Sequence, residues 1–267
     1  MGERTNIVTL TNFYKNYWRQ VVIEQAIEIK TADGTADGFI FRPDGADKLP
    51  GVIHLTDIGG IRPSHRTLAE RVAAKGYVVL MPNVFYRTGR PPMFDFTPKM
   101  GEERTMKRFG ALAVPMTPEA QERDAAAYVD FLAAHAGVSG GKMGVVGYCF
   151  TGGMAMRTAA VRPDKIGAVA SFHGGGLYTE TPASPHHVLP RVKARLYFGH
   201  AIEDHSMPAE AIKKLDGALA AWGGKSQSEV YDGAYHGWTT PDAPVYNRSQ
   251  AERAFEKLTA LFAETLK

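Results

Sequence analysis

The chain has 267 residues, of which 44% are hydrophobic, and this length suffices for one substantial core in a single α/β domain. Its formal net charge is +3 with both signs mixed along the chain, which excludes a basic nucleic-acid stripe and a membrane-binding face. A single cysteine excludes an intramolecular disulfide, and no run of about 18 apolar residues occurs, so we expect a soluble, cytoplasmic protein.

The N-terminal region shows no clear hydrophobic period. Residues 1–24 are polar and aromatic, and we interpret them as an arm that packs on the domain or on a partner, followed by a single domain over 25–267. Within that domain, 25–30 alternates in hydrophobicity and 38–42 follows a turn that ends in Gly34. This pattern predicts a hairpin of edge strands.

Strands and helices alternate along the rest of the chain. The short apolar run 50–56 is typical of a central parallel strand, and a helix over 63–75 and a strand over 76–81 follow it. Further elements are predicted as strands over 142–146, 166–172, 194–199 and 228–231, and as helices from 117, over 154–160, over 209–222 and near the C-terminus. The order predicts a doubly wound, mostly parallel sheet with helices on both faces.

One long segment interrupts this alternation. Residues 83–116 are rich in proline and have no clean periodicity, although parts of the segment are compatible with short helices. A stretch of this length without regular structure in a compact domain is often functional. We therefore predict a lid or substrate loop over 83–116.

The sequence GYCFTGG over 147–153 lies between a predicted strand and a predicted helix. Its spacing G-x-C-x-x-G is that of a nucleophile elbow with cysteine in the serine place, and Thr151 occupies the usual position of the second glycine. A helix that starts after Cys149 favours the thiolate, and the N–H of Phe150 can face an oxyanion. Cys149 is therefore predicted as the nucleophile; the alternative is an inert buried cysteine.

A cysteine nucleophile needs a base, and the base needs an orienting acid. His236 follows the strand over 228–231, and Asp204 follows the strand over 194–199, so both fall at the carboxyl edge of the predicted sheet. The order nucleophile, acid, histidine is that of α/β-hydrolases. The alternatives are a structural loop histidine and a helix-capping aspartate. The remaining histidines lack metal-ligand spacing, so no metal and no cofactor is expected.

Three segments together resemble the dienelactone hydrolase family of α/β-hydrolases over about 26–264: the cysteine elbow, the region of Asp204, and GAYHGW over 233–238. The resemblance implies an α/β-hydrolase fold with Cys149 as nucleophile, His236 as base and Asp204 as its acid. It also implies an oxyanion hole formed by the backbone N–H groups of Phe150 and Ile58.

The chain departs from the chlorocatechol enzymes of that family at two points. Those enzymes carry glutamate at the position of Asp57, and that glutamate helps to convert the thiol into the thiolate. Asp57 is therefore the candidate thiol switch, with a side chain one methylene shorter than glutamate. They also bind the substrate carboxylate with two arginines. Arg87 matches one of them, and 239–241 contains no counterpart of the second. Arg87 is thus either a carboxylate ligand or a surface ion-pair residue. Further candidates for substrate contact are Tyr148, His173 and Trp238.

The predicted function is a hydrolase that opens a lactone or a small carboxylic ester through a thioester acyl-enzyme. A thioesterase or general carboxylesterase would use the same residues with a different pocket. Two alternatives belong to other classes: a thiol redox sensor, and a non-catalytic binding protein on a hydrolase scaffold. The expected partner is the small ester or lactone itself, and the sequence is compatible with a homodimer.

Overall fold

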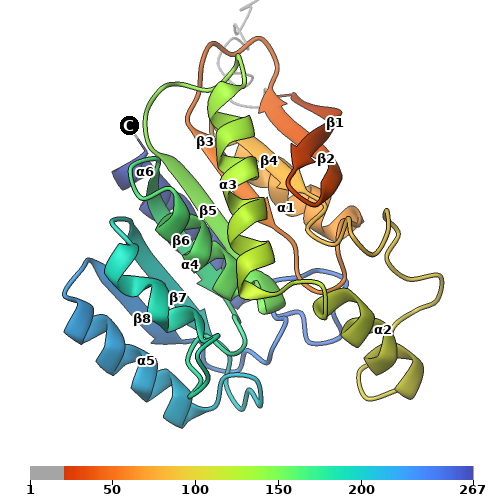
Figure 1. Ribbon diagram of the computed structural model, residues 1–267, viewed down its shortest axis with the longest axis vertical. Helices are drawn as coiled ribbons and strands as arrows, with labels where there is room; N and C mark the ends of the chain where they lie inside the picture. The colour runs from red at the N-terminus through yellow and green to blue at the C-terminus, as the bar shows by residue number, and fades with distance from the viewer. Residues whose placement is uncertain (1–20, 267) are drawn as a thin grey trace, which may run out of the picture.

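The computed structural model describes residues 21–266, so the arm predicted before the domain lies almost entirely outside the described residues. One sheet runs in the order β1-β2-β4-β3-β5-β6-β7-β8 (Figure 1). Its strands are β1 (Val22–Thr31), β2 (Gly34–Pro43), β3 (Gly51–Leu55), β4 (Val78–Pro82), β5 (Met143–Tyr148), β6 (Ile166–Phe172), β7 (Arg195–His200) and β8 (Ser226–Val230). The helices are α1 (Pro63–Ala73), α2 (Glu103–Ala113), α3 (Pro118–Ala134), α4 (Gly152–Val161), α5 (Ala209–Trp222) and α6 (Arg248–Thr265), with 3₁₀ turns at Cys149–Thr151 and Pro185–Arg191.

The predicted edge hairpin is present. β1 and β2 pair antiparallel from Val22 opposite Pro43 to Thr31 opposite Gly34. Because β1 already begins at Val22, the boundary set between arm and domain at residue 24 falls inside a strand and is corrected here. Residues 23–26 are exposed on this edge strand, so no hydrophobic alternation marks where it starts.

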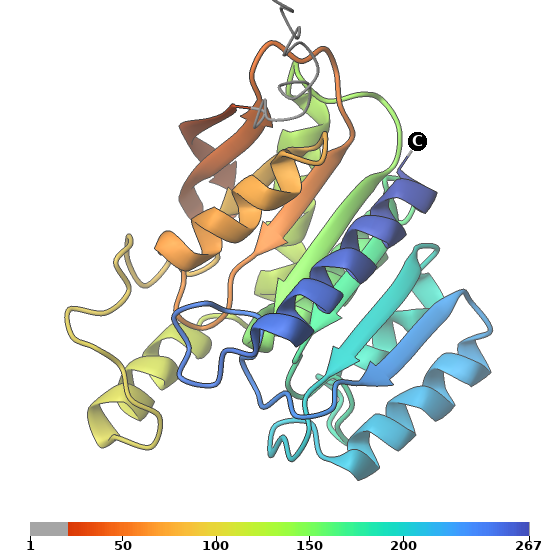
Figure 2. The same cartoon turned by 180° about the vertical axis from the view of Figure 1, so that it is seen from behind.

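The predicted doubly wound sheet is confirmed. β2 pairs antiparallel with β4, and all later neighbours in the sheet are parallel. Helices α3, α4 and α5 cover one face, and α1 and α6 cover the other (Figures 1 and 2). Within residues 21–266 no helix combines the length and the apolar character needed to cross a bilayer.

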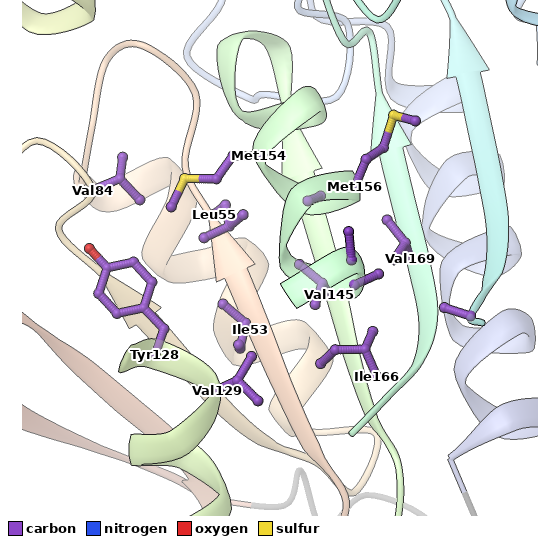
Figure 3. Close-up of a cluster of buried hydrophobic side chains, with 14 of the residues drawn as sticks. Ile53, Leu55, Val84, Tyr128, Val129, Val145, Met154, Met156, Ile166 and Val169 are labelled. Atoms are coloured by element: carbon purple, nitrogen blue, oxygen red, sulfur yellow. The ribbon is translucent and has the colours of Figure 1, made fainter. Parts of the chain in front are cut away.

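The central strands are apolar because the core covers them, as the face of the sheet under α4 shows. All residues of β3 and β5 are buried, as expected for strands covered on both sides. Met154 and Met156 of α4 pack over the sheet near Leu55 of β3 and Val169 of β6 (Figure 3). This packing fixes α4, and with it the turn that precedes the helix.

The segment 83–116 is more regular than predicted. It contains α2, in which only Thr105 and Leu112 are buried, so this helix contributes little to the core. α2 and the loop that leads to it lie outside the two helical layers (Figures 1 and 2). The parallel strands end at the same edge of the sheet, and the segment 83–116 begins at that edge.

Candidate active site

Cys149 occupies a sharp turn between β5 and α4. Its φ angle is +54°, a left-handed conformation that costs free energy for a side chain other than glycine. Close approach explains the glycine after it: a Cβ on Gly152 would lie 2.4 Å from the Ser171 hydroxyl oxygen and 2.8 Å from the Gly174 Cα. The glycine frame of the predicted elbow is therefore required by packing.

Thr151 replaces the second glycine of the usual motif and adds hydrogen bonds. Its hydroxyl accepts from the Tyr148 backbone N–H at 3.0 Å and lies 3.1 Å from the Leu55 carbonyl oxygen, to which it donates. Leu55 is the last residue of β3, two positions before Asp57. Thr151 thus ties the cysteine turn to the neighbouring strand end, a role that sequence analysis missed.

Asp204 and His236, from the loops after β7 and β8, meet beside Cys149. The Nδ1 of His236 lies 2.6 Å from Oδ2 of Asp204, and His236 and Cys149 line the same cavity. Burial disfavours the imidazolium, but interactions with Asp204 and Cys149 outweigh it and raise the pKa of His236 to about 10. Burial likewise opposes ionisation of Asp204, while His236 and Ser206 lower the pKa of this carboxyl to about 2.

Ser206 is a member of this group that sequence analysis missed. Both its backbone N–H and its hydroxyl donate to Oδ1 of Asp204, at 2.8 and 2.6 Å. Aspartate followed two residues later by serine is a common local turn, so the spacing itself was a usable signal. The two carboxylate oxygens are divided between Ser206 and His236.

The cysteine opens into a cavity of about 510 Å³, a volume within the usual range for small-molecule sites. Cys149, His173 and His236 line it on the side of the sheet, together with Ile58 after β3. The opposite side comes from the segment before and within α2, through Pro92, Met93, Phe94, Phe96, Thr97, Pro98, Met100 and Phe109. The 83–116 segment therefore contributes directly to the pocket.

Comparison with known proteins identifies the family of this chain. The model of the dienelactone hydrolase family matches residues 36–266. The chain belongs to the dienelactone hydrolase family. It is accordingly a hydrolase that acts on ester bonds, with the α/β-hydrolase fold.

Individual members of the family align over most of the chain. A carboxymethylenebutenolidase of Rhodococcus opacus is 31% identical over 202 residues, which cover 72% of this chain and 73% of that protein. A Synechocystis protein assigned the same activity is 28% identical over 236 residues, 86% of this chain and 92% of that protein. A crystal structure from Klebsiella pneumoniae assigned as a dienelactone hydrolase superposes with a TM-score of 0.81 at 21% identity, over 91% of this chain and 99% of that chain, and shows the shared fold.

Asp57, predicted from the dienelactone hydrolase family as a thiol switch, lines the same cavity as Cys149. Its carboxylate accepts from Arg62, with Nη1 to Oδ1 at 2.6 Å and Nη2 to Oδ2 at 2.8 Å, and from the Gly59 N–H at 2.8 Å. Burial opposes its charge, but His65 and Arg62 hold the pKa of Asp57 well below its ordinary value. Asp57 is thus an ionised anchor for Arg62, and the switch role stays a prediction.

Behind Asp57 lies a pair of buried histidines. His65 Nε2 lies 3.2 Å from Oδ2 of Asp57 and accepts from the Asp57 backbone N–H at 3.3 Å. His65 Nδ1 lies 2.9 Å from His54 Nε2. Burial lowers the pKa of His54 well below its ordinary value, so His54 is neutral. The pair comes from β3 and α1, and no spacing rule pointed to it.

Arg87, matched to a substrate arginine of the dienelactone hydrolase family, lies outside the residues that line the cavity. Its Nη1 and Nη2 donate to the two carboxylate oxygens of the fully buried Asp124 at 2.6 and 2.9 Å. Nη2 also contacts Asp33 at 2.5 Å. This position favours the ion-pair interpretation of Arg87 over carboxylate binding.

The three remaining candidates for substrate contact differ in position. His173 lines the cavity, with Nε2 2.7 Å from the Thr239 hydroxyl oxygen, and burial lowers its pKa to about 3, so it is neutral. Tyr148 and Trp238 are buried and do not line the cavity: Tyr148 stacks on Phe172, and Trp238 contacts His173 edge-on. Of the three, only His173 is placed to touch a bound molecule.

Proposed function

We propose that this chain hydrolyses a lactone or small carboxylic ester through a thioester on Cys149. The observation that carries the proposal is the hydrogen bond between His236 Nδ1 and Asp204 Oδ2 in a cavity of ligand size that Cys149 and His236 both line. Nucleophile, base and orienting acid in hydrogen-bond contact are the requirement for covalent acyl transfer. The name of the Rhodococcus opacus relative, a carboxymethylenebutenolidase, agrees with this substrate class.

In the resting enzyme His236 is protonated, because its pKa is raised to about 10, and Cys149 attacks as the thiolate, which is the nucleophilic form of a cysteine. The sulfur then attacks the carbonyl carbon, and the tetrahedral intermediate collapses with cleavage of the C–O bond. The leaving oxygen takes the proton from His236, and the acyl group remains on Cys149 as a thioester. In a lactone this leaving hydroxyl stays tethered to the acyl group.

The second half restores the enzyme. Neutral His236 removes a proton from water as the water attacks the thioester, the C–S bond breaks, and the carboxylic acid leaves. Asp204 stabilises the imidazolium in both halves of the reaction. The backbone N–H groups of Phe150 and Ile58 are the proposed donors to the oxyanion; the first belongs to the turn after Cys149, and the second residue lines the same cavity.

The proposal is tested by time-resolved mass spectrometry of the protein mixed with aryl esters, acyl thioesters and lactones. We expect a transient mass increase equal to the acyl group on the peptide that contains Cys149, with product formed in the same time course. Cys149→Ser should acylate far more slowly, and Cys149→Ala should not acylate. The substrate with the highest turnover separates lactonase, carboxylesterase and thioesterase.

A matched pair of variants tests the base. His236→Ala should lower kcat by on the order of 10² to 10⁴, the usual contribution of general-base catalysis. Tyr235→Ala changes the exposed neighbouring side chain and serves as the control. Full turnover by His236→Ala would rule out the assignment. Peroxide-sensitive modification of Cys149 without hydrolysis of any ester would instead identify a redox sensor.

A further inference from the structure

Arg62 is the one arginine or lysine among the described residues that line the cavity. All five of its N–H groups already have acceptors. Nε donates to Asp242 Oδ2 at 2.7 Å, Nη1 to Asp57 Oδ1 at 2.6 Å and to the Gly60 carbonyl at 3.3 Å, and Nη2 to Asp57 Oδ2 at 2.8 Å and to Asp242 Oδ1 at 3.3 Å. No donor of this guanidinium is left for a substrate carboxylate.

The charges around Arg62 point the same way. Two carboxylates, Asp57 and Asp242, face one guanidinium, so this part of the lining carries a net negative charge. Both pKa values are held below the ordinary value: burial opposes ionisation of each carboxyl, but Arg62 outweighs it at Asp242, and His65 and Arg62 outweigh it at Asp57. An anionic substrate would therefore meet repulsion from this part of the lining, where Arg62 has no free donor to offset it.

The remaining wall is apolar and aromatic. Phe94 packs edge-to-face against Phe96, with ring centroids 5.6 Å apart, and against Phe109 at 5.7 Å. Met93 and Met100 extend the same surface. Such a wall favours an aromatic or other apolar group of the substrate, because burial of that group removes apolar area from water.

We infer that the site takes neutral esters or lactones with an aromatic or other apolar side group, and that Asp242 excludes carboxylate-bearing substrates by occupying Arg62. The inference deepens the proposed function and depends on it for the reaction itself. The charge preference, however, belongs to the cavity, and it can be measured as binding without any turnover.

The test compares 4-nitrophenyl phenylacetate with 4-nitrophenyl (4-carboxyphenyl)acetate, two esters that differ by one carboxylate. In the wild type, kcat/KM for the neutral ester should exceed that for the anionic ester by on the order of 100-fold. Asp242→Asn removes the charge, and Asp242→Ala also frees two N–H groups of Arg62. The anionic-to-neutral ratio should rise about tenfold in Asp242→Asn and further in Asp242→Ala. Asp130→Asn, which removes an equal charge from an exposed ion pair with Arg162, should keep the wild-type ratio.

Calorimetric binding of both intact esters to Cys149→Ala separates the two proposals. Preferential binding of the neutral ester, with a preference that becomes smaller when Asp242→Ala is added, supports the charge inference. If no ester is hydrolysed in that case, only the proposed function fails. Equal or preferred binding of the anionic ester to Cys149→Ala overturns the charge inference, whether or not Cys149 becomes acylated. An unchanged ratio in both Asp242 variants overturns it as well.

Discussion

Ser206 holds the Asp204 carboxylate at Oδ1, the oxygen that His236 leaves free. The Ser206 hydroxyl donates to Oδ1 at 2.6 Å while His236 Nδ1 contacts Oδ2 at 2.6 Å, so each oxygen has its own side-chain partner. A carboxylate gripped at both oxygens cannot rotate without breaking a hydrogen bond. Ser206, two residues after Asp204, therefore helps to set the orientation of the His236 imidazole.

Ser206→Ala should reduce kcat by about two- to twelvefold, the kinetic equivalent of one net hydrogen bond, because Asp204 keeps its backbone partner but loses the hydroxyl. Steady-state kinetics with a neutral aryl ester measures the change, and KM should stay within a factor of two. Ser206→Thr, which retains the hydroxyl, should recover most of the rate. Equal losses in both variants would argue against an orienting role.

Arg87→Met should destabilise the fold by about 3–5 kcal/mol, since it leaves the carboxylate of Asp124 buried without its cation. Urea unfolding at pH 7 measures the loss. Adding Asp124→Asn to Arg87→Met should restore part of it, because the charge that lacks a partner is then gone. A rise in KM without any loss of stability would instead make Arg87 a substrate ligand.

Acid should destabilise the protein below pH 6.5 through three buried neutral histidines. Burial lowers the pKa of His54, of His173 to about 3 and of His200 to about 4, whereas the unfolded chain protonates each near 6.5. The unfolded state therefore binds more protons as the pH falls. Each histidine should remove up to about 1.4 kcal/mol of unfolding free energy per pH unit until its folded pKa is reached.

The contribution of His200 to this slope can be isolated. His200→Asn should flatten the fall in unfolding free energy between pH 6.5 and 4, measured by urea titrations at half-unit intervals. His187→Asn changes an exposed histidine and should leave the slope as in the wild type. A slope that does not respond to His200→Asn would show that the acid sensitivity arises elsewhere.

Gly152→Ala should destabilise the protein by about 1–3 kcal/mol, because its Cβ would press against Ser171 and the Gly174 backbone. The displaced turn should also lower kcat. Gly217→Ala is the matched control: it lies exposed within α5 with open space around its Cα, and it should stabilise by about 0.5–1 kcal/mol. Thermal unfolding of both variants gives the comparison, and a tolerated Gly152→Ala would contradict the close packing of the turn.

The elements that carry the site could be predicted because each rests on a local pattern. Short apolar runs between turn residues marked β3 and β5 to β7, and parallel strands bring their carboxyl ends to one edge. That geometry alone placed Cys149, Asp204 and His236 at the same edge. The contact of Ser206 with Asp204 could also have been predicted, since the turn that forms it involves only the three consecutive residues 204–206.

The polar network under the cavity could not be predicted, because its partners share no sequence relationship. Arg62 joins Asp57, five residues earlier, to Asp242, which lies 180 residues later in the chain. His54 of β3 reaches His65 only because α1 packs on the neighbouring strands β2 and β4. Such contacts depend on how helices pack on the sheet, and neither hydrophobic period nor motif spacing encodes that packing.

Eight of the residues that line the cavity come from one continuous stretch, 92–109, that adds no strand to the sheet. The reacting groups, by contrast, come from separate loops whose positions the whole sheet fixes. Substitutions within 92–109 can therefore alter the apolar part of the pocket while Cys149, Asp204 and His236 keep their places. The charged part of the lining, at Arg62 and Asp242, lies outside that stretch and can change separately.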